Sequence, residues 1–217
     1  MAKSGSAAGM RRTDDVPPSG TRKLLVDAAI ETLKQKGFGG ASARAIAEAA
    51  GSNQALIFYH FGSVTNLLLA ALDAVSADRL SQYSEALESV GSVGDLVDAA
   101  TGIFESDLDA GYITVLAEMI AGASSSPGLG AEVAARIGPW RSFAQDAIER
   151  SLGGSFLSQA LPAPDVAYAV VALYLGLEML SHLDGDRGPA IDLFAHAKHL
   201  APLFDAMSGA PSREEGR

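Results

Sequence analysis

Apolar residues recur every three or four positions through most of the chain, which is typical of helices with one buried face. In the segment TRKLLVDAAIETLKQK, Leu25, Ala28, Ala29 and Leu33 share one face, as a 3.6-residue period requires. No segment alternates apolar and polar residues for long enough to predict a strand. The pattern therefore predicts an all-α fold.

Glycines and capping residues divide this pattern into separate helices. The expected N-terminal helices are one that begins at Ser19 or Thr21 and ends at Gly37, one after the N-cap Ser42 that ends at Gly51, and one capped by Ser52 or Asn53 that ends at Gly62. Ser63 caps a long helix to about Val90. The later helices are expected at Val93–Asp109, Tyr112–Ala123, Leu129–Leu152, Ala163–Leu183 and Pro189–Met207.

Four parts follow from this division. Residues 1–18 are rich in Ser, Gly, Ala and Pro and are expected to form a flexible arm. Residues 19–62 form a three-helix N-terminal domain, and residues 63–207 form a larger helical body. Residues 208–217 are expected to be a frayed tail.

Composition narrows the class of protein. With 217 residues and 48% hydrophobic residues, the chain can bury a core and is not a disordered protein. It has no cysteine, so a disulfide framework and Cys-ligated metal sites are excluded. No stretch approaches the roughly 18 apolar residues that cross a bilayer, and the N-terminus has no apolar signal region. We therefore expect a cytoplasmic protein without a membrane partner.

Charge is distributed unevenly along the chain. The net charge is −10, yet residues 1–62 hold eight basic against five acidic residues, a formal charge of +3. Residues 63–217 carry the remaining −13. An acidic body repels a phosphate backbone, so contact with a polyanion is expected only in the N-terminal third.

Two short helices joined by a tight turn at Gly51 have the layout of a helix-turn-helix, whose second helix enters the DNA major groove. Further local features accompany this pair: Ala28-Ala29, Gly37-Phe38, Ser42, Ile46-Ala47 with Ala50-Gly51, and Phe58-Tyr59-His60-Phe61. From Leu25 to Leu72 and without a gap, the segment resembles the N-terminal DNA-binding domain of the TetR family of transcriptional repressors. For the remainder of the chain the resemblance is architectural only.

The resemblance implies DNA-binding roles for individual positions. Arg44 matches a position used for base or phosphate contacts, and Gln54 with Ala55 opens the recognition helix, where Gln can pair with adenine. Tyr59 and His60 match phosphate-binding positions. Ser42 also matches one, although it is equally an N-cap. The full expected DNA-binding set is Ser42, Arg44, Asn53, Gln54, Ala55, Tyr59 and His60.

Some positions depart from the family pattern. Phe58 replaces a phosphate-binding tyrosine, and Val64 replaces a lysine that commonly opens the fourth helix. Fewer phosphate contacts predict a shallow dependence of affinity on salt. We expect Arg11-Arg12 or Arg22-Lys23 to compensate in part, the arm by entering the minor groove.

For the body, the resemblance implies a homodimer through the last two helices and a cavity for a small-molecule effector. The helix DVAYAVVALYLGLEML offers Ala167, Val170, Val171, Tyr174 and Gly176 to a partner, with an intrachain core as the alternative. Large or acidic side chains in apolar surroundings are candidates for the effector pocket, although such residues are more often plain core. They are Phe104, Tyr112, Glu118, Met119, Trp140, Phe143, Tyr174 and Glu178.

These features predict a TetR-like repressor that a small-molecule effector releases from a palindromic operator. A helical ligand-binding or scaffold protein with weak or lost DNA binding remains the alternative, because of Phe58 and Val64. An enzyme is not expected: His196 and His199 lie three residues apart without a matching acid–base set, and such a pair is weak evidence for a metal. We therefore expect no cofactor and no metal.

Overall fold

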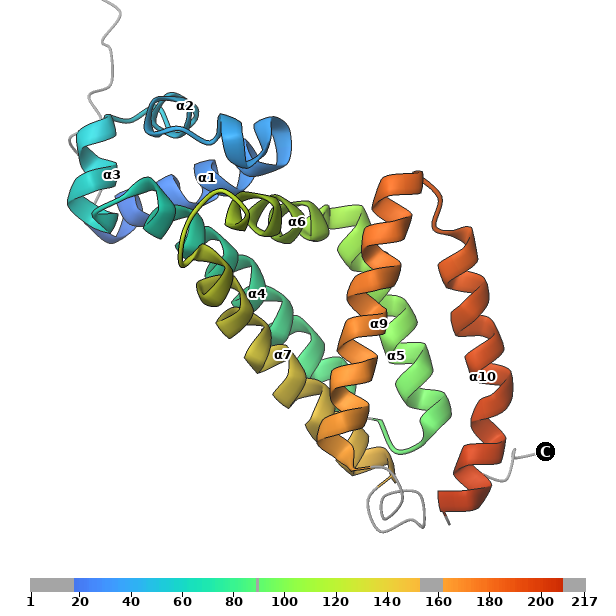
Figure 1. The fold of residues 1–217 in the computed structure, drawn as a ribbon. Helices are drawn as coiled ribbons and strands as arrows, with labels where there is room; N and C mark the ends of the chain where they lie inside the picture. The colour runs from blue at the N-terminus through green and yellow to red at the C-terminus, as the bar shows by residue number, and fades with distance from the viewer. Residues whose placement is uncertain (1–17, 89, 153–161, 209–217) are drawn as a thin grey trace, which may run out of the picture.

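The computed structural model describes residues 18–88, 90–152 and 162–208. Within these ranges the chain forms nine α-helices and no strand (Figure 1), so the predicted all-α class is confirmed. Nearly all of the expected flexible arm, including Arg11 and Arg12, and nearly all of the frayed tail lie outside the described residues.

Three helices build the N-terminal domain: α1 (Pro18–Gly40), α2 (Ala43–Ala49) and α3 (Gln54–Phe61). The regular part of α1 ends where predicted, because Gly37 has φ 68° and ψ 179° and interrupts the helical geometry. Ser42 caps α2, its Oγ accepting the N–H of Ala45 at 3.2 Å. Of the two candidate caps for α3, Asn53 is used, and it accepts the N–H of Ala55 at 2.9 Å.

Six further helices form the body, and their bounds lie within two residues of the predicted ones. The long α4 packs beside α7, and α9 packs on α7, while α5 pairs with α10 (Figure 1). Helix α6 lies between the body and α1. The bounds are α4 (Val64–Glu88), α5 (Val93–Ala110), α6 (Tyr112–Ala123), α7 (Leu129–Leu152), α9 (Ala163–Asp184) and α10 (Gly188–Ser208).

One hydrophobic core joins the N-terminal domain to the body. It contains Leu25, Leu33, Ile46 and Ile57 from α1, α2 and α3, all fully buried. The same cluster continues into α4, α6 and α7 through Leu67, Leu68, Leu72, Val115, Met119, Leu129 and Val133. Each buried aliphatic side chain of this size contributes roughly 1.5–3 kcal/mol. The orientation of α2 and α3 is therefore fixed by the start of α4 and the end of α6.

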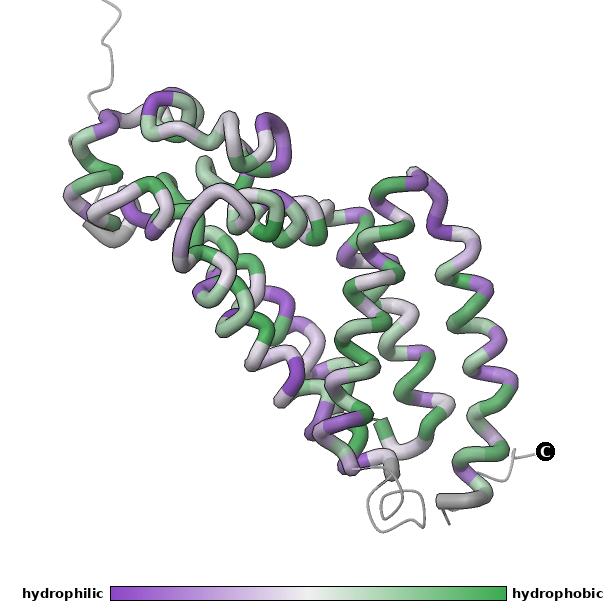
Figure 2. Tube along the Cα trace, in the orientation of Figure 1, coloured by the Kyte–Doolittle hydropathy of each residue, from purple (hydrophilic) through white to green (hydrophobic). Residues whose placement is uncertain are grey.

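Helix α9 corrects one expectation from the sequence. By length and hydropathy, Ala163–Asp184 could cross a membrane, although no apolar stretch of that kind was expected. The difference arises because α9 contains few charged residues. Its mean hydropathy therefore stays high although polar side chains interrupt the apolar sequence. Only 17% of its most apolar window is buried within the described chain. Hydrophobic residues run along α9 and α10 (Figure 2), so these helices present apolar surface that their own chain does not cover.

Candidate nucleic-acid interface and ligand cavity

The α2–α3 pair presents most of the expected DNA-binding side chains to solvent. Ser42, Arg44, Asn53, Gln54 and Ala55 are exposed, and His60 is half-buried. Tyr59 projects furthest, with 81% of its surface exposed. The opposite face of the pair supplies the core residues Ile46, Ala47, Ile57 and Phe61. Short amphipathic helices with this division can offer one polar edge to a groove without losing their core.

Two of the exposed residues already have structural roles. Ser42 and Asn53 cap α2 and α3 through the hydrogen bonds described above, so each satisfies an N–H that the helix leaves without a partner. These caps fix the direction in which each helix begins. The first residues of α3, Gln54 and Ala55, are thereby held at the solvent-facing end of the pair.

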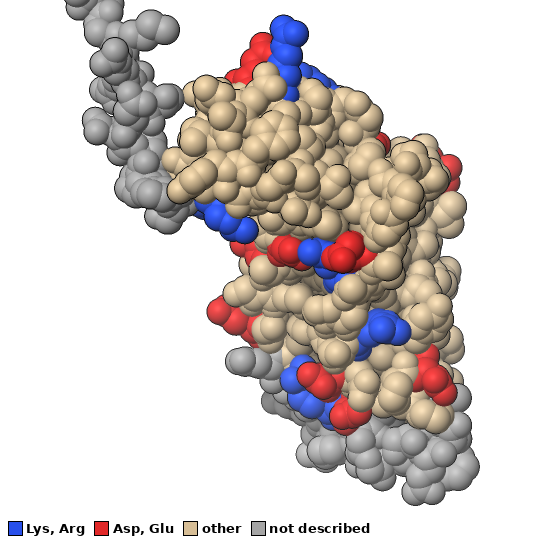
Figure 3. All heavy atoms as spheres, turned by 60° about the vertical axis from the view of Figure 1, so that its left-hand side comes forward, with Lys and Arg blue, Asp and Glu red and all other residues tan. Residues whose placement is uncertain are grey.

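Aromatic residues dominate the exposed edge of α3. Phe58 is half exposed and lacks the hydroxyl that the family pattern places there. The Tyr59 and His60 rings form a T-shaped pair, with centroids 5.0 Å apart. Helix α3 carries no Lys, Arg, Asp or Glu. In the view of Figure 3 the upper part of the molecule is largely uncharged, apart from basic and acidic side chains that project at its top.

Three basic residues near α3 differ in the intramolecular contacts that they make. Arg44 is exposed on α2. The Arg22 guanidinium lies over the Phe61 ring, 4.9 Å from its centroid. Lys23 forms an exposed ion pair with Asp27 at 2.7 Å, and such surface pairs hold the side chain only weakly.

The body contains a cavity of about 150 Å³ between α4, α5, α6, α7 and α9. Its wall is largely aliphatic and aromatic. Four of the expected pocket residues line it, namely Tyr112, Trp140, Phe143 and Tyr174. Residues from five helices therefore enclose one apolar space.

The other four expected pocket residues lie outside that lining. Phe104 is fully buried behind the wall and its ring meets Tyr174 edge-on at 5.8 Å. Met119 belongs to the core shared with the N-terminal domain. Glu118 reaches α1, where its Oε2 accepts the N–H of Phe38 at 2.8 Å. Glu178 is fully buried on α9.

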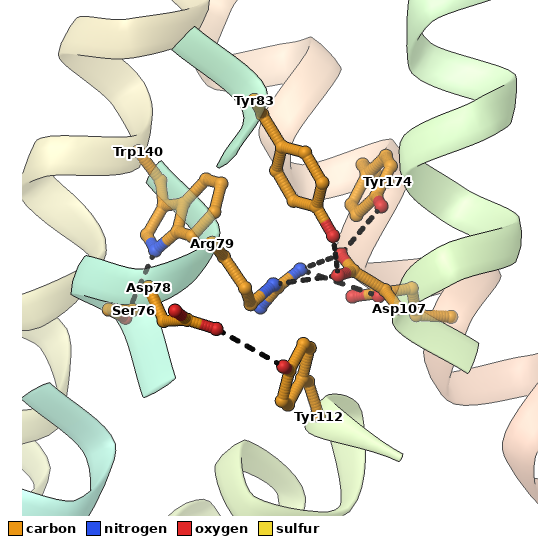
Figure 4. Close-up of polar contacts among 9 residues, drawn as sticks. Ser76, Asp78, Arg79, Tyr83, Asp107, Tyr112, Trp140 and Tyr174 are labelled. Atoms are coloured by element: carbon orange, nitrogen blue, oxygen red, sulfur yellow. Dashed lines mark hydrogen bonds and ion pairs between the residues drawn. The ribbon is translucent and has the colours of Figure 1, made fainter. Parts of the chain in front are cut away.

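A cluster of polar residues, which we call the Arg79 cluster, adjoins the cavity (Figure 4). Arg79 lines the cavity, and its guanidinium donates two hydrogen bonds to the buried carboxylate of Asp107. The hydroxyls of Tyr83 and Tyr174 donate to the same carboxylate at 2.6 and 2.9 Å. Trp140 stacks on the guanidinium at 4.6 Å. Asp107 thus accepts four donors from two other helices.

Glu178 completes the Arg79 cluster without a hydrogen bond. Its Oε1 lies 3.6 Å from Arg79 Nη2, and neither oxygen has a hydrogen-bond partner among the described residues. Burial raises the pKa of Glu178 to about 7, and the Arg79 charge opposes this shift. Burial, helped by the Glu178 charge, also raises the pKa of Tyr174 far above its ordinary value, so Tyr174 stays a neutral donor.

Arg79, Tyr83 and Asp107 are not among the site residues that the sequence predicted. Arg79 and Tyr83 are four residues apart on α4, which places them on one helix face. That spacing was a usable signal for a pair. Nothing local indicated that Asp107, on another helix, would be fully buried against them.

Helix α6 links the cavity to the N-terminal domain. Tyr112 and Leu116 line the cavity, and Glu118 holds the backbone of Phe38. Gly122 lies directly against the Phe38 ring, where an added β-carbon would be 2.4 Å from it. One helix therefore contacts both the cavity and α1 of the N-terminal domain.

Metal ligation finds no support in the described part of the chain, which contains no group of three or more His, Asp or Glu side chains that could hold an ion. His182, His196 and His199 are all exposed.

The fold and the exposed α2–α3 pair define a helix-turn-helix protein. Residues 25–71 match the sequence profile of the tetR family of bacterial regulatory proteins. The transcriptional regulatory protein RaaS of Mycobacterium tuberculosis is 46% identical over 63 residues, which cover 29% of each chain. The sequence similarity to the tetR family of transcriptional regulators therefore lies in the N-terminal domain of this chain.

Solved structures show the same fold over nearly the whole chain. A TetR-family protein from Streptomyces coelicolor is 23% identical, with a TM-score of 0.62, and covers 85% of this chain and 97% of its own. The multidrug binding protein EbrR, in complex with imidazole, is 20% identical, with a TM-score of 0.61, and covers 89% and 97%. The body thus shares its fold with that of these two proteins.

Proposed function

We propose that this chain is a dimeric, cytoplasmic repressor that binds a palindromic DNA operator and leaves it when a small molecule occupies the body cavity. The observation that carries the proposal is the exposed edge of α3, which opens with Gln54 and Ala55 and presents Tyr59 in its last turn. Gln can bond adenine in the major groove, and a small Ala permits close approach.

Affinity is expected to rest on few charges. Arg44 and His60, with the hydroxyls of Ser42 and Tyr59, are the groups we assign to phosphates or bases. Phosphate contacts made by neutral donors release few counterions, so affinity should fall only gently with added salt. Arg11 and Arg12 of the arm are proposed to supplement these contacts in the minor groove.

Dimerisation would be driven by the apolar surface of α9 and α10. Leu183 is 72% exposed and Leu203 is 63% exposed, and exposed apolar patches of this kind mark interaction sites. Ala167 and Tyr174, which the sequence suggested for this interface, face the interior of their own chain instead. The outward face carries Tyr168, Leu173, Leu180, Leu183, Leu193 and Leu200.

The proposed response to an effector uses α4 and α6. Leu72 of α4 belongs to the core of the N-terminal domain and also lines the cavity. A ligand that moves α4 or α6 would therefore reorient α2 and α3 and change the separation of the two recognition helices. It can shift DNA affinity only by its difference in affinity for the two arrangements.

DNA binding is tested by selection of bound fragments from random DNA, followed by anisotropy titrations with the selected site. We expect a palindrome, and Gln54→Ala should weaken binding about tenfold or more at one base position in each half-site. Gln82→Ala is the matched control, since Gln82 is an exposed glutamine on α4 that bonds only Asp78. Failure to select any sequence at modest salt would contradict the proposal and favour a ligand-binding or scaffold protein.

The dimer is tested by sedimentation of the wild-type chain and of Leu183→Glu combined with Leu203→Glu. The double variant should be monomeric, whereas Ile120→Glu, at an exposed position on α6, should remain dimeric. A wild-type chain that sediments as a monomer at micromolar concentration, or that needs lipid to stay in solution, would contradict this interface.

A further inference from the structure

The Arg79 cluster contains a carboxylate that the protein itself does not satisfy. Both oxygens of Glu178 are buried and lack a hydrogen-bond partner among the described residues. The nearest cation, Arg79 Nη2, is 3.6 Å away, which is too long for a hydrogen bond. Buried polar groups almost always have partners, and one without them indicates a missing group.

Glu178 does not line the cavity itself, but it adjoins the residues of α9 and α4 that do. Side chains on a helix lean toward its N-terminus and cover the residues three and four positions earlier. For Glu178 these are Leu175 and Tyr174, and both line the cavity. Arg79, which forms the ion pair with Glu178, lines the cavity as well. The carboxylate therefore lies directly behind the wall formed by Tyr174 and Arg79.

The charges around the cavity favour a cation over an anion. Arg79 is paired with Asp107, and Arg136, the other arginine of the wall, is paired with Asp73 and Glu132. Both guanidinium groups are thus already hydrogen-bonded to other carboxylates, whereas Glu178 has only the 3.6 Å ion pair with Arg79 and no hydrogen bond among the described residues. An ionised Glu178 leaves the Arg79 cluster with two carboxylates for one guanidinium, so one negative charge is uncompensated.

Neighbouring donors do not fill this gap. The Tyr83 and Tyr174 hydroxyls point to Asp107, and Tyr112 donates to Asp78 at 3.4 Å. A neutral hydroxyl from a ligand could make a hydrogen bond to Glu178 but would leave its charge. A protonated amine supplies both the missing N–H donors and the missing charge.

The rest of the cavity suits an aromatic ring. Trp140 and Phe143 form a T-shaped pair with centroids 6.0 Å apart, and both line the cavity. A cavity of about 150 Å³ lined by apolar side chains is the size that binds benzene in engineered proteins. One ring with a short alkyl chain would fill it.

We propose that the cavity binds a small arylalkylamine, whose ring lies between Trp140 and Phe143 and whose ammonium group bonds Glu178 between Tyr174 and Arg79. The role of this amine as the effector rests on the function proposed above. The binding itself does not, because it requires no DNA.

Three probes of nearly equal size separate the charge classes: 2-phenylethylamine, 2-phenylethanol and phenylacetate. Trp140 is the only tryptophan, so its fluorescence reports entry into the cavity, and calorimetry gives the same affinities independently. We expect the amine to bind about tenfold more tightly than the alcohol and phenylacetate to bind most weakly. Equal affinities, a preference for phenylacetate or no binding of any probe would overturn the proposal.

Glu178→Gln keeps the shape of the side chain and removes its charge. This variant should lose the preference for the amine while it still binds 2-phenylethanol, which also shows that its cavity is intact. Glu149→Gln, at an exposed carboxylate on α7, is the matched control and should keep the preference. Retention of the preference in Glu178→Gln would overturn the assignment of this residue.

The effector role is then measured separately with the selected operator. If 2-phenylethylamine binds the wild-type protein but leaves its DNA affinity unchanged, the cavity chemistry stands and the proposed release mechanism fails. If the protein binds no DNA, the fluorescence result still decides the ligand class. The two failures are therefore distinguishable.

Discussion

The N-terminal domain and the Arg79 cluster satisfy polar groups in opposite ways. In α1, α2 and α3 the charged side chains of the described residues remain exposed or half-buried, and Ser42 and Asn53 cap helices at the surface. The interior is aliphatic and aromatic apart from Thr32, whose hydroxyl donates to the Ala28 carbonyl of the same helix. The Arg79 cluster places a guanidinium and two carboxylates, Asp107 and Glu178, inside the body. A surface that reads an external polymer needs exposed donors, whereas a site that detects a small molecule gains strength from low dielectric.

The largest test of this difference removes the acceptor at the centre of the Arg79 cluster. Asp107→Ala leaves Arg79 buried without its main partner, which should lower the free energy of unfolding by about 3–5 kcal/mol. The measurement is urea denaturation followed by circular dichroism. Asp109→Ala, which breaks an exposed ion pair with Arg187, should cost about 1 kcal/mol or less. Equal losses in the two variants would show that burial does not distinguish this cluster.

Glu178→Gln should have the opposite sign and depend on pH. Because the pKa of Glu178 is about 7 in the folded protein and about 4.3 in an unfolded chain, the folded state binds an extra proton between these pH values. Stability of the wild type should therefore fall as pH rises from 4 to 7 and level off above 7. The variant lacks this loss, so we expect it to be more stable by up to about 3 kcal/mol at pH 8 and nearly equal at pH 4. Thermal melts over this pH range measure the difference, and a constant difference would contradict the buried-carboxylate interpretation.

The contact between the two regions is tested by Gly122→Ala. The new β-carbon would overlap the Phe38 ring, and such overpacking costs about 1–3 kcal/mol. Gly102→Ala is the control, since nothing lies within 4 Å of a β-carbon there and alanine stabilises an open helical position by about 0.5–1 kcal/mol. Chemical denaturation should show opposite signs for the two substitutions. Two stabilised variants would indicate that α6 and α1 are not closely packed.

The smallest expected effect lies in the N-terminal domain. Ser42→Ala removes the cap of α2 and should cost about 1 kcal/mol. Ser84→Ala removes a hydroxyl that only bonds the Leu80 carbonyl within α4, so stability should hardly change. A larger loss at Ser84 than at Ser42 would contradict the capping role.

Most of the fold could be predicted because its determinants are local. Gly37, Gly62 and Gly111 end helical segments with positive φ, and Ser42, Ser63 and Ser92 begin helices by capping. These signals lie within a few residues of the boundary that they set. The similarity to the tetR family likewise lies in one continuous segment, residues 25–71. The roles of the individual DNA-binding residues stay predictions.

The arrangement of the body was less predictable because it depends on contacts between distant helices. Tyr174 suited both an interface and a pocket from its apolar neighbours, and its place in the cavity wall depends on how α9 rotates against α7. Glu118 and Glu178 looked alike in sequence, yet one bonds the backbone at Phe38 and the other lies buried beside Arg79. Apolar flanks predict burial but do not identify the partner.

The shared core has a consequence for engineering chimaeric regulators. Leu67, Leu68 and Leu72 belong to the same hydrophobic core as Ile46 and Ile57. A graft that replaces only residues 19–62 would therefore place non-native side chains against these three leucines. Grafts that also include α4 as far as Leu72, together with the end of α6 that packs on this core, should keep the native packing. Such grafts should transfer operator specificity from one regulator to another.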